Sequence, residues 1–446
     1  HHSESDIKMV RTDYAHTGAS WRQYFESNQP RGLFENPIGT AYGVLTQITQ
    51  RLPMAQRLLS ALCAAFFMVS SAFADDLAGS PTAAEPHSLP VVRAPAERRV
   101  PAEWEPQEAI WLQWPGEWEK TYETAFAAFS CIIIQYEKVH VLYQSPQVLH
   151  QAQAALLNAG CNPDHDLITW HDIPNDSAWM RDNGPVFVEE DGEIRVQNWQ
   201  FDAWGGRFGS DVPYELDNLV PQRVAAYLGM PLDDVSIVHE RGNLEFNGVD
   251  TVILNWSTLG DAARNPGYTR TQAEADLKHW FGVSRVVFVE GVPEGDRTNG
   301  HIDGIARFID KDTVVVGQCT AASVCKPGDG KTADLLDSAA QVISDAGFKV
   351  IREPMDGIAE VDGQQFDTNY MNWLIGNGFV ITTGYGDERL DNEAKVRLQH
   401  YFPGRDVYVL PMLKSWAAGG GVHCHTNDQP AQLMADASLS DGHSEQ

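Results

Sequence analysis

The sequence predicts an α/β fold in which about five mixed units of strands and helices are arranged around an axis, as a five-bladed α/β propeller with a central channel. Three observations predict this fold. A hairpin pattern recurs four times, helical patterns follow several of the hairpins, and further strands follow those helices. Radial repetition of such units leaves only short strand edges and encloses a channel. An ordinary mixed α/β sandwich is the alternative.

Each hairpin is a short β-rich run, a turn pair and a second β-rich run. The turn pairs are Asp191-Gly192, Asn247-Gly248, Lys311-Asp312 and Asn377-Gly378. Helical patterns cover residues 269–281 and 332–346, and strands are expected at 285–289 and 349–351. A fifth unit is assembled from the two ends of the region. Strands at 109–114 and 139–143 flank a helical stretch, and a strand at 407–410 leads toward a glycine run.

Composition and charge limit the classes of function. The chain has 446 residues, of which 43% are hydrophobic and 21% charged, which is ordinary for a globular protein with a large core. The formal net charge is −29. Such acidity argues against binding nucleic acid, which requires a basic surface. It either draws cationic ligands toward a cleft or is the solvated surface of a salt-adapted protein.

The N-terminal region has the pattern of a secretory signal peptide at residues 54–74. A short basic start at Met54 precedes an apolar run over residues 58–69, and small residues end at Ala74. The apolar run is too short for a transmembrane helix, so no stable membrane insertion is expected. We therefore expect export to the periplasm or the exterior if the signal is used, and a cytoplasmic enzyme otherwise.

The signal peptide divides the rest of the chain. Residues 1–53 are interpreted as a disordered upstream extension and residues 75–100, rich in Ala, Pro and Glu, as a linker. The catalytic domain is expected at 101–430 and a disordered tail at 431–446.

Six cysteines are too few for a disulfide scaffold. Cys319 and Cys325 are close enough in sequence to close a small loop in an oxidising compartment, but the sequence does not decide whether they pair. Cys424 lies between His423 and His425, yet no second pair of ligands with zinc spacing accompanies this run. We therefore expect neither a metal nor an organic cofactor.

Three glycines, Gly419–Gly421, precede Cys424. Glycine permits close approaches that a Cβ would prevent, so a substrate could reach the thiol. This run by itself is compatible with two interpretations of Cys424. The cysteine is either an inert thiol that precedes an edge strand or a catalytic nucleophile. His423 and His425 are expected to point to the opposite side of that strand from Cys424, because neighbouring residues in a strand alternate faces.

Ionisable residues precede the first three hairpins at similar offsets. Asp182 lies nine residues before the first turn and Glu240 seven before the second, while His301 and Asp303 lie ten and eight before the third. If the units are related by rotation, these side chains converge on the axis, where the last unit delivers Cys424. The sequence thus predicts one pocket with a thiol, an imidazole and three carboxylates.

That set of groups suits the hydrolysis of a guanidine. Asp182 and Asp303 would hold the planar cation, whose donors form a fixed fork. Cys424 would attack its carbon, since a poor electrophile needs a strong nucleophile. His301 would give a proton to the departing ammonia and take one from water, with Glu240 fixing its tautomer. The products are a ureido group and ammonia, formed through a covalent amidino-cysteine.

Trp114 is a further candidate for the substrate site. It follows a predicted strand, and its ring could stack on a cation. A tryptophan in this position is more often a core residue. The expected partner is a small cationic guanidine or the arginine of a peptide, and oligomeric state cannot be read from the sequence.

The ordered motifs resemble those of agmatine deiminases and bacterial-type peptidylarginine deiminases, in the guanidine-modifying superfamily. They are Trp179–Pro185, Asn198–Gly206, Glu240–Gly248, Thr298–Asp303, Asn377–Asp387 and Gly419–Pro430. The resemblance implies a five-bladed propeller of the pentein type and the same five roles for the residues named above. Arg241 departs from the family's Glu-Gly-Gly pattern, and its charge would compete with a cationic substrate if it faced the pocket.

The leading hypothesis is deimination of agmatine to N-carbamoylputrescine, and the near alternative is conversion of peptide arginine to citrulline. A non-catalytic protein that binds guanidines or polyamines is an alternative of another class. A cysteine peptidase or amidase is disfavoured, because it gives no reason for three carboxylates around the thiol.

Overall fold

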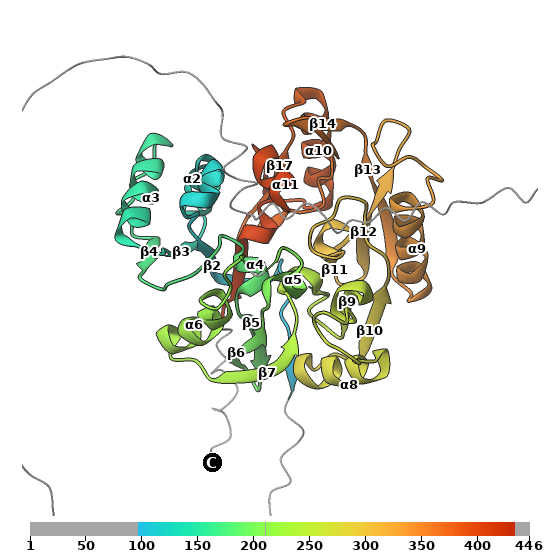
Figure 1. Ribbon diagram of the computed structural model, residues 1–446, viewed down its shortest axis with the longest axis horizontal. Coiled ribbons are helices and arrows are strands. Elements are labelled where there is room, and N and C mark those ends of the chain that lie inside the picture. The colour runs from blue at the N-terminus through green and yellow to red at the C-terminus, as the bar shows by residue number, and fades with distance from the viewer. Residues whose placement is uncertain (1–96, 210, 433–446) are drawn as a thin grey trace, which may run out of the picture. The chain divides into compact units, whose positions relative to one another are not determined.

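The computed structural model describes residues 97–209 and 211–432, which all belong to one compact unit (Figure 1). The predicted upstream extension, the signal peptide, nearly all of the linker and all but the first two residues of the tail lie outside the described residues. No helix within these two ranges is long and apolar enough to cross a membrane.

The fold is mixed α/β, and four of its sheets repeat one pattern. In each, an antiparallel hairpin is followed by a third strand that pairs in parallel with the second strand. These sheets are β5 Val186–Glu190, β6 Glu193–Gln200 and β7 Leu232–Val238; β8 Glu245–Phe246, β9 Thr251–Asn255 and β10 Arg285–Val289; β11 Ala306–Asp310, β12 Thr313–Cys319 and β13 Lys349–Met355; β16 Leu374–Gly376, β17 Phe379–Gly384 and β18 Asp406–Pro411. All four predicted hairpins are confirmed.

A fifth sheet joins the two ends of the described chain. β19 Thr426–Pro430 pairs antiparallel with β2 Gln107–Gln113, which is parallel to β3 Lys138–Leu142, and β4 Ile168–His171 follows β3. The predicted fifth unit is therefore correct in its first two strands. The strand at 407–410 was assigned wrongly, because β18 pairs with β17 and completes the fourth unit instead.

The longer helices pack on the sheets through separate apolar clusters. They are α2 Glu123–Ile133, α3 Pro146–Asn158, α6 Val220–Leu228, α8 Arg270–Phe281, α9 Thr332–Asp345 and α10 Glu388–Tyr401. In α8, Ala273, Leu277 and Phe281 recur every four residues, are fully buried and pack against β8–β10. Thr269 caps this helix in a capping box with Gln272, as the predicted start at 269 requires.

The short helices are α4 Met180–Asn183, α5 Ala203–Gly206, α7 Trp256–Leu259 and α11 Leu413–Ala418. Of these, α4, α5 and α11 lie nearer the middle of the described part than α3, α6, α8 and α9 do (Figure 1). The sequence reading did not include the hairpin of β14 Ile358–Val361 and β15 Gln364–Asp367, nor β1 Arg98–Arg99, which adds to the edge of β5. Because the apolar clusters lie between helices and sheets, the segments that meet at the beginnings of the hairpins are free to carry polar residues.

Two disulfides connect four of the cysteines. Cys319 pairs with Cys325, which confirms the small loop considered from the sequence, and Cys131 pairs with Cys161, which the sequence reading missed. Cys424 is a free, buried thiol.

Candidate active site

Four of the predicted catalytic residues lie just before the first strand of a hairpin, and Cys424 lies just before β19, which pairs antiparallel with β2. Asp182 is in α4, which precedes β5, and Glu240 begins the turn that precedes β8. His301 and Asp303 lie at the turn before β11, and Cys424 lies in the turn before β19. The repeat therefore delivers all five side chains to one place, and the structure brings them together as the sequence predicts.

The Cys424 thiol is enclosed, with a residue exposure of 3%. Its Sγ lies 3.1 Å from Asn372 Nδ2 and 3.5 Å from Asp303 Oδ2. Burial, followed by the charges of Asp303 and Asp182, raises the pKa of the Cys424 thiol well above its usual value. The thiol is therefore protonated until a cation offsets those carboxylates.

The glycine run makes room for the thiol itself. A Cβ at Gly420 would lie 2.4 Å from Cys424 Sγ, a distance that no real contact allows. A Cβ at Gly421 would lie 2.2 Å from Thr383 Oγ1. Gly420 and Gly421 are thus required by packing around Cys424, before any substrate is considered.

His301 lies between two carboxylates. Its Nδ1 is 3.5 Å from Asp182 Oδ1 and its Nε2 is 3.5 Å from Glu240 Oε2. Burial alone lowers the pKa of His301, but Asp182, Glu240 and Asp303 together outweigh it and raise the pKa to about 9. A Cβ at Gly242 would lie 2.6 Å from both Asp182 Oδ1 and His301 Nδ1, so only glycine fits beside this pair.

Glu240 is itself held by a buried arginine. Arg264 Nε lies 2.9 Å from Glu240 Oε1 and 3.2 Å from Oε2, and both side chains are fully buried. Burial raises the pKa of Glu240, but the guanidinium of Arg264 and the neighbouring His301 lower it to about 2. Glu240 is therefore a permanent anion at neutral pH. No pattern in the sequence pointed to Arg264, which lies in a loop away from the motifs.

The two aspartates differ in how they are bonded. Asp182 Oδ2 accepts a 2.8 Å hydrogen bond from the indole N–H of Trp204, whereas its Oδ1 has no hydrogen-bond partner among the residues that the structure describes. Burial raises the pKa of Asp182 to about 7. Asp303 Oδ2 lies 2.8 Å from His423 Nδ1 and 3.0 Å from Asn372 Nδ2. Burial opposes ionisation of Asp303, but the interactions with His423, His301 and Arg307 together outweigh it, so the pKa of Asp303 lies below its usual value.

The prediction for His423 was wrong. Residues His423–His425 form a 3₁₀ turn and not a strand, so their side chains do not alternate between two faces. His423 lies beside the site, bonded through Nδ1 to Asp303 and through Nε2 to Glu103 at 3.0 Å. His425 is bonded to Ser415 and to the Ala178 carbonyl. His423 thus belongs to the shell that holds Asp303.

Trp114 is not at the site. It is fully buried in the core, where it packs against Phe126 and Trp170 and donates its indole N–H to Glu123 over 3.3 Å. The expectation that its ring meets a substrate cation was therefore wrong, and the competing interpretation as a core residue is confirmed.

Arg241 does not face the cavities beside the site. Its guanidinium forms two hydrogen bonds with Asp428, of 2.8 and 2.9 Å, and Asp428 also accepts from Arg181 at 2.8 Å. Arg241 is paired with a buried carboxylate and is directed away from the cavities. It therefore does not compete with a cationic substrate, as the sequence analysis expected it to do if it faced the pocket.

Sequence reasoning missed Asn372 and Trp204. Asn372 lies five residues before the turn Asn377-Gly378, at the place in the fourth unit where the other units carry their site residues. Its offset of five residues is shorter than the seven to ten residues of the other units, so the common offset does not point to it. Trp204 belongs to the motif Asn198–Gly206 and has a left-handed backbone, with a φ of 59°, which places its indole on Asp182.

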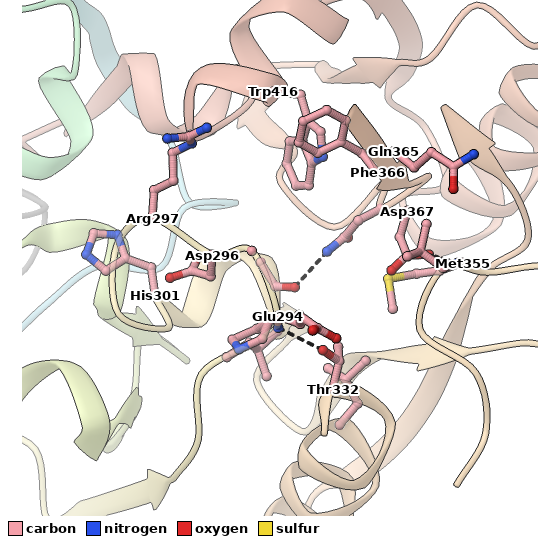
Figure 2. Close-up of a pocket in the computed structure, with 18 of the residues that line it drawn as sticks. Glu294, Asp296, Arg297, His301, Thr332, Met355, Gln365, Phe366, Asp367 and Trp416 are labelled. Atoms are coloured by element: carbon pink, nitrogen blue, oxygen red, sulfur yellow. Dashed lines mark hydrogen bonds between the residues drawn. The ribbon is translucent and has the colours of Figure 1, made fainter. Parts of the chain in front are cut away.

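Two cavities reach the catalytic residues. The larger, of about 160 Å³, is lined by His301, Arg297, Trp416, Asp367 and Gly419 among others (Figure 2). A much smaller one is lined by Asp182, Trp179, Trp204 and Arg297. In the part of the chain that the structure describes, no group of three or more His, Cys, Asp or Glu side chains is arranged to hold a metal ion.

A buried thiol, a cationic imidazole and several carboxylates define the class of cysteine-dependent enzymes that act on a cationic group. Residues 99–430 match the Porphyromonas-type peptidyl-arginine deiminase family. The chain belongs to this family, whose members are hydrolases that act on guanidino groups.

Known relatives and solved structures agree with this membership. The agmatine deiminase of Pseudomonas aeruginosa (strain LESB58) is 30% identical over 371 residues, which cover 76% of this chain and 96% of the relative. An agmatine deiminase of Enterococcus faecalis, solved while catalysing its reaction, has a TM-score of 0.65 and 28% identity, covering 76% of this chain and 97% of the other. A putative arginine deiminase from Porphyromonas gingivalis has the same TM-score and identity, with coverages of 76% and 100%.

Proposed function

We propose that this protein hydrolyses agmatine to N-carbamoylputrescine and ammonia through a covalent amidino-cysteine. The observation that carries the proposal is the arrangement around Cys424, in which Asp303 lies against the sulfur and Asp182 keeps an oxygen without a hydrogen-bond partner among the described residues. Agmatine is the substrate named for relatives that are 30% identical across most of their length.

In the first step Asp182 and Asp303 hold the guanidinium group as two hydrogen-bond acceptors. The substrate's positive charge offsets the two carboxylates that keep the thiol protonated, so binding itself favours the thiolate of Cys424. The pocket therefore generates its nucleophile only when a cation is present.

The thiolate then attacks the guanidinium carbon and forms the C–S bond. His301, which is protonated at neutral pH, gives its proton to the terminal nitrogen. The C–N bond breaks, ammonia leaves, and an amidino group remains on the sulfur.

In the second step, neutral His301 takes a proton from a water molecule that attacks the same carbon. The C–S bond breaks, which regenerates the Cys424 thiolate beside protonated His301, and the ureido product leaves after its oxygen gives up the second proton of the water to the solvent, where ammonia becomes ammonium. Glu240, held by Arg264, stays ionised throughout and keeps the imidazole in place.

The test is a mass spectrum of the enzyme quenched during turnover with agmatine. We expect an amidino adduct on Cys424 that disappears in Cys424→Ala, together with ureido product in a colorimetric assay. Free arginine and an arginine-containing peptide serve as comparison substrates and test the peptidylarginine alternative. No ureido product from any of them would overturn the proposal. Binding of agmatine by Cys424→Ala, with no turnover by the parent, would indicate a binding protein.

We also propose that the five units form a five-bladed propeller around a central channel. Five sheets share the hairpin-plus-parallel-strand pattern or its equivalent, and the first strand of each hairpin begins beside the site. A crystal structure that contains the substrate would test this arrangement, since the guanidine should lie at the axis.

Export is a further proposal. The pattern of residues 54–74 indicates a signal peptide, and two disulfides among the described residues favour an oxidising compartment. The mature enzyme would then begin at Asp75, with a linker before the catalytic domain at 101–430. N-terminal sequencing of the protein recovered from the producing cells tests this, and a mature chain that retains residues 54–74 would contradict it.

A further inference from the structure

One wall of the large cavity is a hairpin that does not belong to the repeated sheets. In the part of the chain that the structure describes, β14 and β15 pair only with each other. All four residues of β15, Gln364–Asp367, line the cavity. In Figure 2, Phe366 and Asp367 lie across the cavity from His301. Because an isolated two-stranded hairpin is marginally stable in water, this wall depends on the contacts that hold it in place.

The hairpin is anchored on one side by apolar packing and a hydrogen bond. Ala359 of β14 is buried in an apolar cluster with Tyr370, Tyr385, Leu390 and Ala394. Asn369, two residues after β15, donates from Nδ2 to the carbonyl of Gly304 over 2.9 Å, and Gly304 follows Asp303 in the chain. The wall therefore starts beside the catalytic residues, and its position sets the space that a substrate can occupy.

The strand β15 is also bound to a loop that a disulfide closes. This disulfide loop comprises residues 319–325, from Cys319 at the end of β12 to Cys325. The backbone N–H groups of Val324 and Cys325 both donate to the carboxylate of Asp367, and Cys325 N lies 3.2 Å from its Oδ2. One carboxylate thus joins the last residue of β15 to the disulfide loop.

The disulfide loop holds a second part of the wall. The hydroxyl groups of Thr320 and Ser323 both donate to the carbonyl of Met355, over 3.1 Å from Thr320. Met355 is the last residue of β13 and lines the cavity, as Val324 of the loop does. The loop therefore connects β13 to β15 at the cavity.

The bond between the two cysteines gives the loop its shape. Val324 is 44% exposed, so its side chain adds little packing, whereas Cys319 and Cys325 are buried in an apolar cluster. The disulfide fixes Cys325 close to the end of β12, which directs two N–H groups at Asp367. Without that bond the segment samples more conformations, and ordering it becomes a cost of binding.

We propose that the disulfide between Cys319 and Cys325 regulates substrate binding, because the large cavity has a complete wall only when this bond is formed. This rests on the guanidine hydrolysis proposed above and adds a redox condition to it. The bond forms by exchange with a disulfide oxidant, which takes two electrons and two protons from the two thiols and becomes two thiols itself. A dithiol reductant reverses the exchange and leaves the enzyme with weak affinity for its substrate.

The first test is the steady-state kinetics of Cys319→Ala/Cys325→Ala, which buries no new polar group. We expect KM for agmatine to rise about tenfold, because the apparent affinity falls by the fraction of molecules that have an ordered wall. The value of kcat should not change, since bound substrate orders the wall and the catalytic residues are untouched. An unchanged KM would overturn the proposal.

The matched control is Cys131→Ala/Cys161→Ala, which removes the other disulfide, with a sequence separation of 30. It should lose more stability than the first variant but keep the parental KM, because this bond closes a longer loop away from the cavity. An equal rise of KM in both variants would make the effect one of general stability and overturn the proposal.

Reduction of the bond itself is tested in the control variant, where the disulfide between Cys319 and Cys325 is retained. Once a mass spectrum confirms that excess dithiothreitol has broken this bond, KM should rise to the value of Cys319→Ala/Cys325→Ala. It should return after oxidation with oxidised dithiothreitol. A parental KM with the bond broken would contradict regulation by this disulfide.

A double-mutant comparison tests whether Asp367 and the disulfide loop act together. Asp367→Ala removes the same connection from the side of β15, so it should raise KM by itself and add little when combined with Cys319→Ala/Cys325→Ala. If the two effects multiply fully, Asp367 acts on the substrate independently of the loop, and the proposed connection is wrong.

Two measurements without turnover separate this inference from the proposed reaction. Amide hydrogen exchange over residues 358–367 should be faster in Cys319→Ala/Cys325→Ala than in the parent and unchanged in the control. Isothermal titration with agmatine should show about tenfold weaker binding when the same two substitutions are added to Cys424→Ala. If no substrate is turned over but both differences are present, the reaction is wrong and the redox-dependent cavity stands. Equal affinities and equal exchange would remove it even if agmatine were hydrolysed.

Discussion

The side-chain amide of Asn372 donates a 3.1 Å hydrogen bond to the sulfur of Cys424. The same nitrogen lies 3.0 Å from Asp303, and the amide oxygen accepts from the Gly421 N–H at 3.1 Å. One asparagine therefore fixes the thiol, a substrate-binding carboxylate and the glycine run relative to one another.

Replacing Asn372 should weaken the nucleophile. In Asn372→Ala the thiolate loses a donor, so the pKa of the Cys424 thiol rises, and kcat should fall by roughly 10- to 100-fold, as for one hydrogen bond to a charged group. The pH dependence of alkylation of Cys424 by iodoacetamide measures the thiol directly. Asn392→Ala, at an exposed position of α10, is the control and should change neither value. Unchanged alkylation in Asn372→Ala would leave Asn372 with a structural role only.

Gly420 should tolerate no side chain. A Cβ at this position would lie 2.4 Å from Cys424 Sγ, so Gly420→Ala must displace the nucleophile. We expect kcat to fall at least about 100-fold, because small misplacements of reacting groups have effects of that size. Gly317→Ala is the matched control, since its Cβ would make only ordinary contacts, with Leu336 at 3.5 and 3.6 Å and with the Ile305 carbonyl at 3.9 Å. Thermal unfolding should show both variants folded. A Gly420→Ala enzyme with parental kcat would contradict the arrangement around Cys424.

The pH dependence of kcat/KM should be bell-shaped, because two groups act in opposite protonation states. Asp182 must be ionised to hold the cation, and its pKa is raised to about 7, so activity should be lost as the pH falls through that value. His301 must be protonated to release ammonia, and its pKa is raised to about 9, so activity should be lost as the pH rises through it. Steady-state kinetics from pH 5 to 10.5 would measure both limbs, and constant activity above pH 9 would exclude His301 as the acid.

Arg264 should set the position of the alkaline limb. In Arg264→Met, Glu240 loses the cation that holds its pKa near 2, so it becomes easier to protonate and stabilises the imidazolium of His301 less. The pKa of His301 then falls, and the alkaline limb should move to lower pH. The variant should also be less stable by about 3 to 5 kcal/mol, because it leaves a buried carboxylate unpaired. Denaturant titration measures the stability, and an unmoved alkaline limb in a folded variant would show that Glu240 does not act through His301.

The repeated pattern made much of the fold and site predictable. The turn pairs fixed four hairpins, and side chains at a common offset before three of the turns identified Asp182, Glu240, His301 and Asp303. The same reasoning failed at Cys424 in one respect, because a 3₁₀ turn replaces the expected strand and brings His423 onto Asp303. Local sequence does not distinguish the two conformations when tertiary contacts decide between them.

Residues that act through long-range contacts could not be predicted. Arg264 contacts Glu240 and Arg241 contacts Asp428 between segments far apart in sequence, and no spacing rule connects these pairs. Trp114 was misplaced for a related reason, because an indole that follows a strand looks the same in sequence whether it faces a core or a cavity. Asn372 lies closer to its turn than the site residues of the other units lie to theirs, so the common offset did not identify it.

The disulfide between Cys131 and Cys161 should contribute to stability in the compartment where it forms. It links the end of α2 to the segment after α3 across 30 residues, and in the chain-entropy account a loop of this length stabilises the fold by about 3 to 4 kcal/mol. Cys131→Ser/Cys161→Ser should therefore unfold at lower denaturant while kcat is retained, because neither cysteine contacts the site. The Cys319–Cys325 disulfide closes a much shorter loop, with a sequence separation of 6, so Cys319→Ser/Cys325→Ser should lose less stability. Urea titrations of the oxidised parent and of both variants measure which disulfide contributes more to stability.

A second test uses a reducing agent. It should lower the stability of the parent and leave that of a variant lacking all four of these cysteines unchanged. An equal loss in both proteins would show that the disulfides do not stabilise the fold.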